Sequence, residues 1–365
     1  MYPENVVPAG PYTLRPPVEA DAEAVARACD DPEIARFLPL MPSPYTREDA
    51  LSWITGVSRE TWKRGGADYA VTDTATGELL GVAGLKPLDP LGNGEVGYWV
   101  APWARGRGVA TAAVRALAEL AFAQGVPRIA LIAEIENIAS QRVALAAGFR
   151  REGVLRAAQG SRDGSRADMA AFARLATDPG AAITPYLPFF PGGELTDGVV
   201  RLAPLTPADA GDYHAMASVP DVYARHVPPE PPVRAECEEL CRYAMHRWLS
   251  GHQAGIAIRD AATGEFAGDI QLSNIVPPLD QAMTGYSLRP EFRGRGFVTR
   301  AVELLVEWAF THTSLRRIVA GTAPDNTASQ RVLERAGFVR EALVKDLLPG
   351  PGGTRMDDVQ WSRTR

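Results

Sequence analysis

The sequence predicts two consecutive α/β domains of the same fold, each with a mixed sheet flanked by helices, and the main observation behind this is a long internal repeat. The tetrapeptide Arg105–Gly108 (Arg-Gly-Arg-Gly) recurs at Arg293–Gly296, 188 positions later, and 14 of 26 positions are identical between residues 97–122 and 285–310. Each copy follows an extended apolar run and opens a helix. A repeat of this length is a copied domain rather than a solenoid unit, and 365 residues allow each domain its own core.

The elements of the two copies follow the same order. Each begins with a short strand and a helix that starts at an acidic residue, Asp21 or Asp209, which favours a helix N-terminus. Each copy continues with a helix (46–63 and 233–250), an antiparallel hairpin (69–72 with 79–85, and 255–259 with 266–272) and a strand (95–100 and 284–288). The loop with its long helix comes next, followed by a strand (128–132 and 317–320) and a last helix (140–147 and 329–336). Gly148 and Gly337 stand where a helix C-terminus favours glycine.

The domain boundaries follow from composition. Residues 178–198 are rich in Pro and Gly, so they are predicted to link a first domain at 1–177 to a second at 199–365. Within the linker, Tyr186, Leu187, Phe189 and Phe190 favour packing onto a domain over a free chain.

Charge and composition limit the classes of partner, the compartment and the metal content expected of this chain. A formal net charge of −6 disfavours nucleic acid and suits a cationic amine, although it is also ordinary for solubility. No apolar run is long enough to span a bilayer, residues 1–10 have no signal-peptide pattern, and the three cysteines fit a reducing cytoplasm. Cys237, Cys241 and His246 lack a standard zinc spacing, so buried thiols are expected and no metal is predicted.

The repeated loop predicts phosphate binding. Its glycines let backbone N–H groups turn inward, the following helix adds its free N–H groups, and the arginines add forked donors. The loop is neither a Walker A motif nor a dinucleotide fingerprint.

A second repeated element, Asn137-x-x-Ser140 and Asn326-x-x-Ser329, also follows a strand in each copy. Helix capping explains one of the two polar residues, and the recurrence of both indicates an added ligand role.

On these residues both halves resemble the GCN5-related N-acetyltransferase (GNAT) superfamily, and most closely its branch that acetylates ribosomal-protein N-termini and many small amines. The first copy matches the family's Arg/Gln-x-x-Gly-x-Gly/Ala signature over residues 105–110. In the second copy Val298 replaces the small last residue, and its branched side chain would crowd the pyrophosphate. The resemblance implies that each sheet splays at a bulge in its fourth strand.

The same resemblance implies acetyl-CoA as co-substrate and a set of residues that bind it. The pantetheine arm would pair with backbone on the splayed strand, Asn137 and Asn326 would face it, and Arg142 and Arg331 would reach a phosphate. The implied binding residues are Trp99, Val100, Arg105, Gly106, Arg107, Gly108, Val109, Ala110, Asn137 and Arg142 in the first copy, and Ser287, Leu288, Arg293, Gly294, Arg295, Gly296, Phe297, Val298, Asn326 and Arg331 in the second.

Acetyl transfer to an amine needs an acid for the leaving thiolate and a route for the amine's proton. The positions where many relatives carry a tyrosine acid hold Ala144 and Leu333, so the resemblance assigns the acid to Ser140 and Ser329, with capping as the rival role. Glu95 is the candidate base, acting directly or through water, and the second copy has Met283 there. Glu134, Glu136 and Asp325 are weaker candidates, and proximity alone can carry much of the reaction.

The leading hypothesis is an acetyl-CoA-dependent N-acetyltransferase, active at least in its first half, that acetylates a primary amine of a small molecule or peptide in a ternary complex. The missing tyrosines leave open a non-catalytic acetyl-CoA-binding sensor or scaffold. Acyl transfer to a hydroxyl and thioester hydrolysis also stay open. Because a duplicated domain supplies what a dimer partner otherwise would, a monomer acting as a pseudo-dimer is predicted.

Overall fold

A computed structural model describes residue 2 and residues 4–365. The chain divides into two compact units, Met1–Thr184 and Pro185–Arg365. The division lies inside the segment expected to be the linker. Among the described residues, no helix combines the length and apolar character needed to cross a membrane.

The first unit is an eight-stranded mixed sheet flanked by helices. Its strands are β1 (Val7–Ala9), β2 (Tyr12–Arg15), β3 (Ala67–Asp73), β4 (Leu79–Leu85), β5 (Gly94–Val100), β6 (Arg128–Glu134), β7 (Arg150–Gly160) and β8 (Arg166–Leu175), in the spatial order β1-β2-β3-β4-β5-β6-β8-β7. Its helices are α1 (Ala22–Cys29), α2 (Pro32–Phe37), α3 (Arg47–Ser52), α4 (Ser58–Lys63), α5 (Val109–Ala123) and α6 (Ile138–Ala146). A π-helical turn at Trp53–Val57 joins α3 to α4, which confirms the continuous helix predicted over 46–63.

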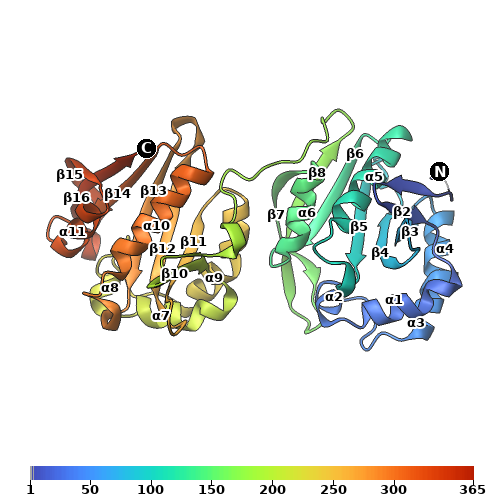
Figure 1. Ribbon diagram of the computed structural model, residues 1–365, viewed down its shortest axis with the longest axis horizontal. Coiled ribbons are helices and arrows are strands. Elements are labelled where there is room, and N and C mark those ends of the chain that lie inside the picture. The colour runs from blue at the N-terminus through green and yellow to red at the C-terminus, as the bar shows by residue number, and fades with distance from the viewer. Residues whose placement is uncertain (1, 3) are drawn as a thin grey trace. The chain divides into compact units, whose positions relative to one another are not determined.

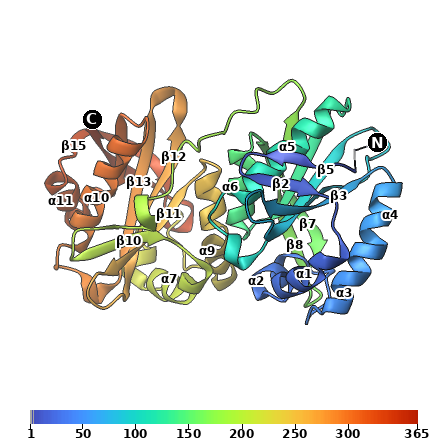
Figure 2. The same ribbon diagram turned by 45° about the vertical axis from the view of Figure 1, so that its right-hand side comes forward.

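The second unit repeats this architecture (Figures 1 and 2). Its strands are β9 (Leu195–Thr196), β10 (Val200–Pro204), β11 (Ala254–Asp260), β12 (Phe266–Val276), β13 (Gln281–Leu288), β14 (Arg317–Thr322), β15 (Val339–Pro349) and β16 (Arg355–Thr364), and its spatial order corresponds to that of the first sheet. Its helices are α7 (Ala210–Ala217), α8 (Pro220–Tyr223), α9 (Arg234–Leu249), α10 (Phe297–His312) and α11 (Thr327–Arg335). The predicted duplicated α/β fold is therefore confirmed.

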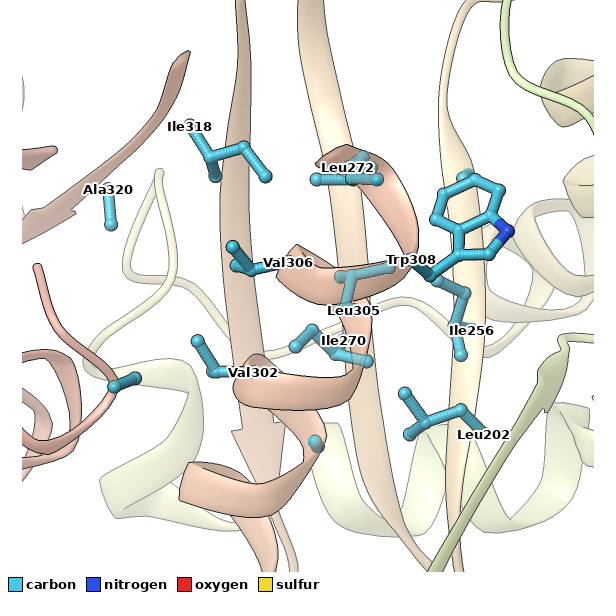
Figure 3. Packing of buried hydrophobic residues seen from close by; sticks show 14 of the residues in the cluster. Leu202, Ile256, Ile270, Leu272, Val302, Leu305, Val306, Trp308, Ile318 and Ala320 are labelled. Carbon is cyan, nitrogen blue, oxygen red and sulfur yellow. The ribbon is translucent and has the colours of Figure 1, made fainter. Parts of the chain in front are cut away.

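The larger hydrophobic cluster of the second unit lies between α10 and one face of the sheet, and a smaller one contains residues of α7 and α9. Val302, Leu305 and Val306 of α10 point at Ile270 of β12 and Ile318 of β14, all of them buried (Figure 3). Their spacing on α10 places them on one helix face, as in an amphipathic helix that covers a sheet.

Part of the predicted linker belongs to this core. Leu187 and Phe190 are fully buried in the second unit, and the Phe190 ring packs edge-on against Trp248 and Trp308. Burial of these apolar side chains holds residues 185–198 on the second unit, in spite of their Pro and Gly content.

Each sheet is mixed because one strand pair is parallel and separates along its length. β5 pairs with β6 only at Gly94 and Glu95, and β13 pairs with β14 only at residues 281–283. Beyond these positions the strands diverge, and we call the opening the fork. The predicted splay is therefore present, but the strand involved is the fifth, since β1 and β9 precede the strands that were expected.

The expected bulge is absent from the forked segments. β4 and β5 pair without a register shift from Val96 to Val100, and β12 and β13 pair continuously from Met283 to Leu288. In the first unit the fork therefore arises where the parallel pairing stops, and the expectation of a bulge in β5 was wrong. In the second unit the β12–β13 ladder shifts register between Ser273 and Val276, opposite the residues of β13 that still pair with β14.

Candidate functional site

The repeated loop has the backbone that an anion-binding turn requires. Gly106 and Gly108 have φ of 74° and 79°, and Gly294 and Gly296 have φ of 72° and 80°, a region that glycine occupies without strain. A Cβ added at any of the four would meet nothing within 4 Å, so the loop faces open space.

The helix after the loop begins at its second glycine. In α5 the first helical hydrogen bond runs from the Ala112 N–H to the Gly108 carbonyl, and in α10 from the Arg300 N–H to the Gly296 carbonyl. The N–H groups that precede these donors in the first turn of each helix have no intrahelical acceptor. They point toward the loop, as the N–H groups of anion-binding sites at helix N-termini do.

The residues that open these helices turn into the domains. Val109 and Phe297 are buried, as is Ala110, and Val298 is partly buried and packs against the core of the second unit. Val298 therefore packs part of its side chain against the core, and its crowding of the phosphate stays a prediction.

Carboxylates hold the loop arginines in both units. Arg105 lies 2.5 Å from Asp31 and Arg107 lies 3.2 Å from Asp73, and Arg293 and Arg295 pair in the same way with Asp221 and Asp260. Backbone N–H groups, that of Thr76 foremost, and Arg107 hold the pKa of Asp73 below its usual range, so the carboxylate stays charged. These pairs orient the loop, and its backbone N–H groups remain as the donors offered to an anion.

The fork exposes backbone on the strand that leads into the loop. Val82 pairs with Trp99 and Gly81 with Val100 on the β4 side, and no described strand pairs with them on the β6 side. The corresponding residues of the second unit are Ser287 and Leu288, which pair with Asp269 and Gly268. An extended ligand can hydrogen-bond to such an edge as an added strand does.

The Asn-x-x-Ser element divides its two roles between its two residues. Asn137 caps α6, because its Oδ1 accepts the Ser140 N–H at 3.0 Å, and Asn326 caps α11 through the Ser329 N–H at 3.2 Å. The Ser140 hydroxyl instead lies 2.8 Å from the hydroxyl of Tyr98 on β5, and Ser329 lies 2.8 Å from Tyr286 on β13. The rival capping role therefore belongs to the asparagines, and the serine hydroxyls are directed at the forked strand.

Sequence reasoning missed the two tyrosines. Burial raises the pKa of Tyr286 to about 12 and raises that of Tyr98 as well, so both phenols keep their protons at neutral pH. The sequence did contain a signal for these tyrosines, because Gly97-Tyr98 and Gly285-Tyr286 occupy equivalent positions in the two copies. Ala144 and Leu333, where related enzymes were expected to carry a tyrosine, are fully buried.

Glu95 lies on the other face of the same strand. Side chains alternate along β5, so Glu95 and Trp99 face the side of α1 and α3, while Tyr98 faces α6. Trp99 packs against the α1 and α3 cluster, and Glu95 pairs with Lys86 at 2.5 Å. The structure therefore separates the candidate base from Ser140 by the thickness of the strand, at the edge of the fork.

Two weaker candidate bases are held in ion pairs. Glu136 pairs with Arg36, and Asp325 pairs with Arg225 at 2.6 Å, in equivalent positions just before the capping asparagines. They tie the end of α2 and the segment after α8 to the starts of α6 and α11. Arg142 and Arg331 are exposed on those helices, and Glu134 ends β6.

The cysteines are free and buried, which agrees with the expectation of buried thiols. Among the residues that the structure describes, no group of three or more His, Cys, Asp or Glu side chains is arranged to hold a metal ion.

Comparisons of the chain with known protein families and with curated proteins both find acetyltransferases. A family model described as an acetyltransferase (GNAT) domain matches residues 12–150 and again residues 200–339. The chain is 40% identical over 86 residues to the "Probable N-acetyltransferase YjcK" of Bacillus subtilis, covering 23% of this chain and 48% of YjcK. It is 32% identical over 116 residues to the ribosomal-protein-serine acetyltransferase of Escherichia coli, covering 31% of this chain and 65% of that protein. The match spans about half the length of YjcK and less than two thirds of the length of two further curated N-acetyltransferases of Bacillus.

Solved structures give matches to about half of the chain. Mycobacterium smegmatis RimJ in complex with CoA-disulfide is 25% identical, covers 46% of this chain and 82% of its own, and has a TM-score of 0.42. The microcin C7 self-immunity acetyltransferase MccE, in complex with acetyl-CoA and AMP, is 19% identical, covers 47% and 94%, and has a TM-score of 0.42.

Proposed function

Because this chain belongs to the GNAT acetyltransferase family, we propose that it is an acetyl-CoA-dependent N-acetyltransferase that transfers an acetyl group to a primary amine of a small molecule or peptide. The observation that carries the proposal is the joint arrangement of loop, fork and hydroxyl pair in each unit. The family match alone leaves the reaction and the acceptor open.

The residues fit acetyl-CoA as a substrate. The N–H groups at Gly106, Gly108 and the start of α5 suit its pyrophosphate, and the open edge of β5 suits the amides of its pantetheine arm. In the second unit, the equivalent donors come from Gly294, Gly296 and the start of α10, with the open edge of β13.

In the proposed reaction the neutral amine attacks the thioester carbonyl carbon, the carbon–sulfur bond breaks, and the thiolate takes a proton. Ser140 supplies that proton and regains one from water, and Tyr98 acts as a positioning residue that orients the Ser140 hydroxyl. Glu95, on the opposite face of β5, accepts the proton that the amine loses, directly or through water. Backbone N–H groups at the fork polarise the carbonyl.

The test is a calorimetric titration of the full chain with acetyl-CoA, followed by mass analysis of the products formed with a panel of amines. We expect two binding sites per chain and an acetylated amine as product. Binding without any product would support a sensor or scaffold, and free acetate or an ester would support hydrolysis or transfer to a hydroxyl. We further propose that the chain is a cytoplasmic monomer, and light scattering in the same buffer tests whether it is monomeric.

The contact between Tyr98 and Ser140 gives a prediction in which two single variants are compared with the double variant. Tyr98→Phe removes one hydroxyl and is expected to lower kcat about 10-fold, since one hydrogen bond contributes about 1.4 kcal/mol, with little change in KM for acetyl-CoA. Ser140→Ala is expected to lower kcat about 100-fold, and the double variant to lower it no further than Ser140→Ala alone.

Steady-state kinetics with an amine acetylated by the first domain measures this effect, and Tyr286→Phe in the second copy is the matched control. A rise in KM with unchanged kcat in Tyr98→Phe would make the tyrosine part of the binding surface and remove it from proton transfer.

A further inference from the structure

The second domain has two buried carboxylates at positions where the first domain has apolar residues. Asp269 on β12 is 7% exposed and Asp358 on β16 is 3% exposed. In each, Oδ1 has no hydrogen-bond partner among the described residues. An unpaired buried carboxylate oxygen costs stability, so its presence calls for a ligand that offsets the cost.

Strand register places both carboxylates on one face, on the two sides of the fork. Asp269 pairs with Ser287 of β13, and from Ser287 the same face continues to Met283 and across to Val319 of β14. From there it continues through Gly321 to Gln360 and Asp358 of β16. This is the face of α7 and α9, because Asp269 acts electrostatically on Tyr213 and Cys241. It is opposite to the face on which Tyr286 contacts Ser329.

A glycine on the neighbouring strand, Gly321, leaves room for the Asp358 carboxyl group. A Cβ at Gly321 would lie 2.7 Å from both Asp358 oxygens, so any side chain at position 321 would displace the carboxylate. In the first domain the equivalent positions hold Ile132 and Met169, and Met169 is buried. The glycine and the aspartate of the second domain are therefore a coupled change.

Around Asp269, too, the second domain has polar residues where the first domain has apolar ones. Ser287 donates hydrogen bonds to the Asp269 carboxyl, and the His226 Nε2 lies 3.3 Å from the Ser287 hydroxyl. The equivalent residues of the first domain are Val82, Trp99 and Phe37, all apolar. Arg225 pairs with Asp325 as Arg36 pairs with Glu136, so His226 and Phe37 reach their sites from the same anchored segment.

We propose that the second domain is a separate acceptor site for an amine that carries a further positive charge, with Asp269 and Asp358 as its cation ligands. The first domain, with Val82, Trp99 and Met169 on the same face, takes an amine with an apolar body. This inference rests on the proposed function, because that function places the acceptor on the face opposite the Tyr–Ser pair.

The experiment compares two probes with the same six-carbon chain, 1,6-diaminohexane and hexylamine, titrated into the full chain at pH 8 without acetyl-CoA. We expect 1,6-diaminohexane to bind at least about 10-fold more tightly, because only it presents a second ammonium group to a carboxylate. Asp269→Asn and Asp358→Asn are each expected to weaken its binding about 10-fold or more. Asp212→Asn, which alters an exposed carboxylate on α7, is the matched control and is expected to change nothing.

Equal affinity for the two probes, or diamine binding that survives both substitutions, would overturn the inference. A subsequent assay for acetylated diamine separates it from the proposed function. Carboxylate-dependent binding without acetylated product would keep the subsite and refute the proposed activity in this domain. Acetylation with an unchanged KM in both variants would keep the activity and refute the subsite.

Discussion

Replacing Gly108 by tryptophan is expected to lower acetyl transfer by the first domain at least about 100-fold and to reduce the number of acetyl-CoA sites per chain from two to one. Gly108 ends the loop and caps α5, and its missing side chain faces open space. An indole there would occupy the volume that the proposed pyrophosphate needs and cover the N–H groups of the first helical turn. A 100-fold loss corresponds to about 2.7 kcal/mol of transition-state stabilisation.

The backbone cost of this change can be matched by a glycine at the other end of the same helix. Gly108 has φ of 79°, so a tryptophan there is also strained by about 1–2 kcal/mol. Gly125, just after the end of α5, has φ of 84° and open space around its Cβ position, so Gly125→Trp carries the same strain far from the loop.

Calorimetric stoichiometry and initial rates measure both variants, and Gly296→Trp applies the same change to the second domain. If Gly108→Trp retains two sites and full activity toward every amine, the loop does not bind the co-substrate and the proposed function falls. An equal loss in Gly125→Trp would instead assign the effect to strain.

Asp269→Asn is expected to stabilise the second domain at pH 8 and to have little effect near pH 4. Burial raises the pKa of Asp269 from 3.8 to about 7, with hydrogen bonds from Ser287 opposing the rise. A raised carboxyl pKa means that the folded state prefers the neutral form, so the folded domain loses stability as the pH rises from 3.8 through about 7. At about 1.4 kcal/mol for each pH unit, the ionised group destabilises the domain by up to about 4 kcal/mol above about pH 7.

The surroundings of Asp269 leave this charge uncompensated. The titratable groups that the structure places toward it are Tyr213 of α7, Cys241 of α9 and, through Ser287, His226. Burial raises the pKa of Cys241 to about 12 and lowers the pKa of His226, so neither group supplies a positive charge at pH 8.

Urea unfolding of the parent chain and Asp269→Asn at pH 5 and pH 8 measures the effect. The stabilisation by the variant should grow with pH, whereas Val82→Asn, the equivalent position of the first domain, should destabilise at both pH values. A variant that is destabilised to the same extent at both pH values would show that Asp269 serves the fold. Stabilisation combined with lost diamine binding is the pattern expected of a group kept for function.

The local elements of both domains were largely predictable. The strands at 12–15 and 79–85, the helix at 46–63 and the glycine ends at Gly148 and Gly337 are set by periodicity and turn chemistry, and they agree with the structure. The last hairpin of each unit was missed. β7 and β15 are mostly exposed, and apolar side chains such as Leu155, Val339 and Leu343 are among the exposed ones, so no regular alternation of apolar and polar residues marks a buried face. Pairing with β8 and β16 holds both strands in the sheet.

The candidate site was predictable only in part, for the same reason. The loop and the Asn-x-x-Ser element are contiguous in sequence, and their recurrence marked them. The partners of Ser140 and Asp358 lie on other strands, and no spacing in the chain relates Ser140 to Tyr98 or Asp358 to Gly321.

The duplicated α/β fold, the two loops and the family to which they belong could all be inferred from the amino-acid sequence, because they depend on local periodicity, glycine conformation and repetition. Three relations emerged only from the folded chain: the asparagines cap while the serines contact tyrosines, Glu95 and Ser140 face opposite sides of a strand, and the two domains differ in charge on one face of the fork. These relations depend on strand register and on burial, which arise when segments distant in sequence pack together.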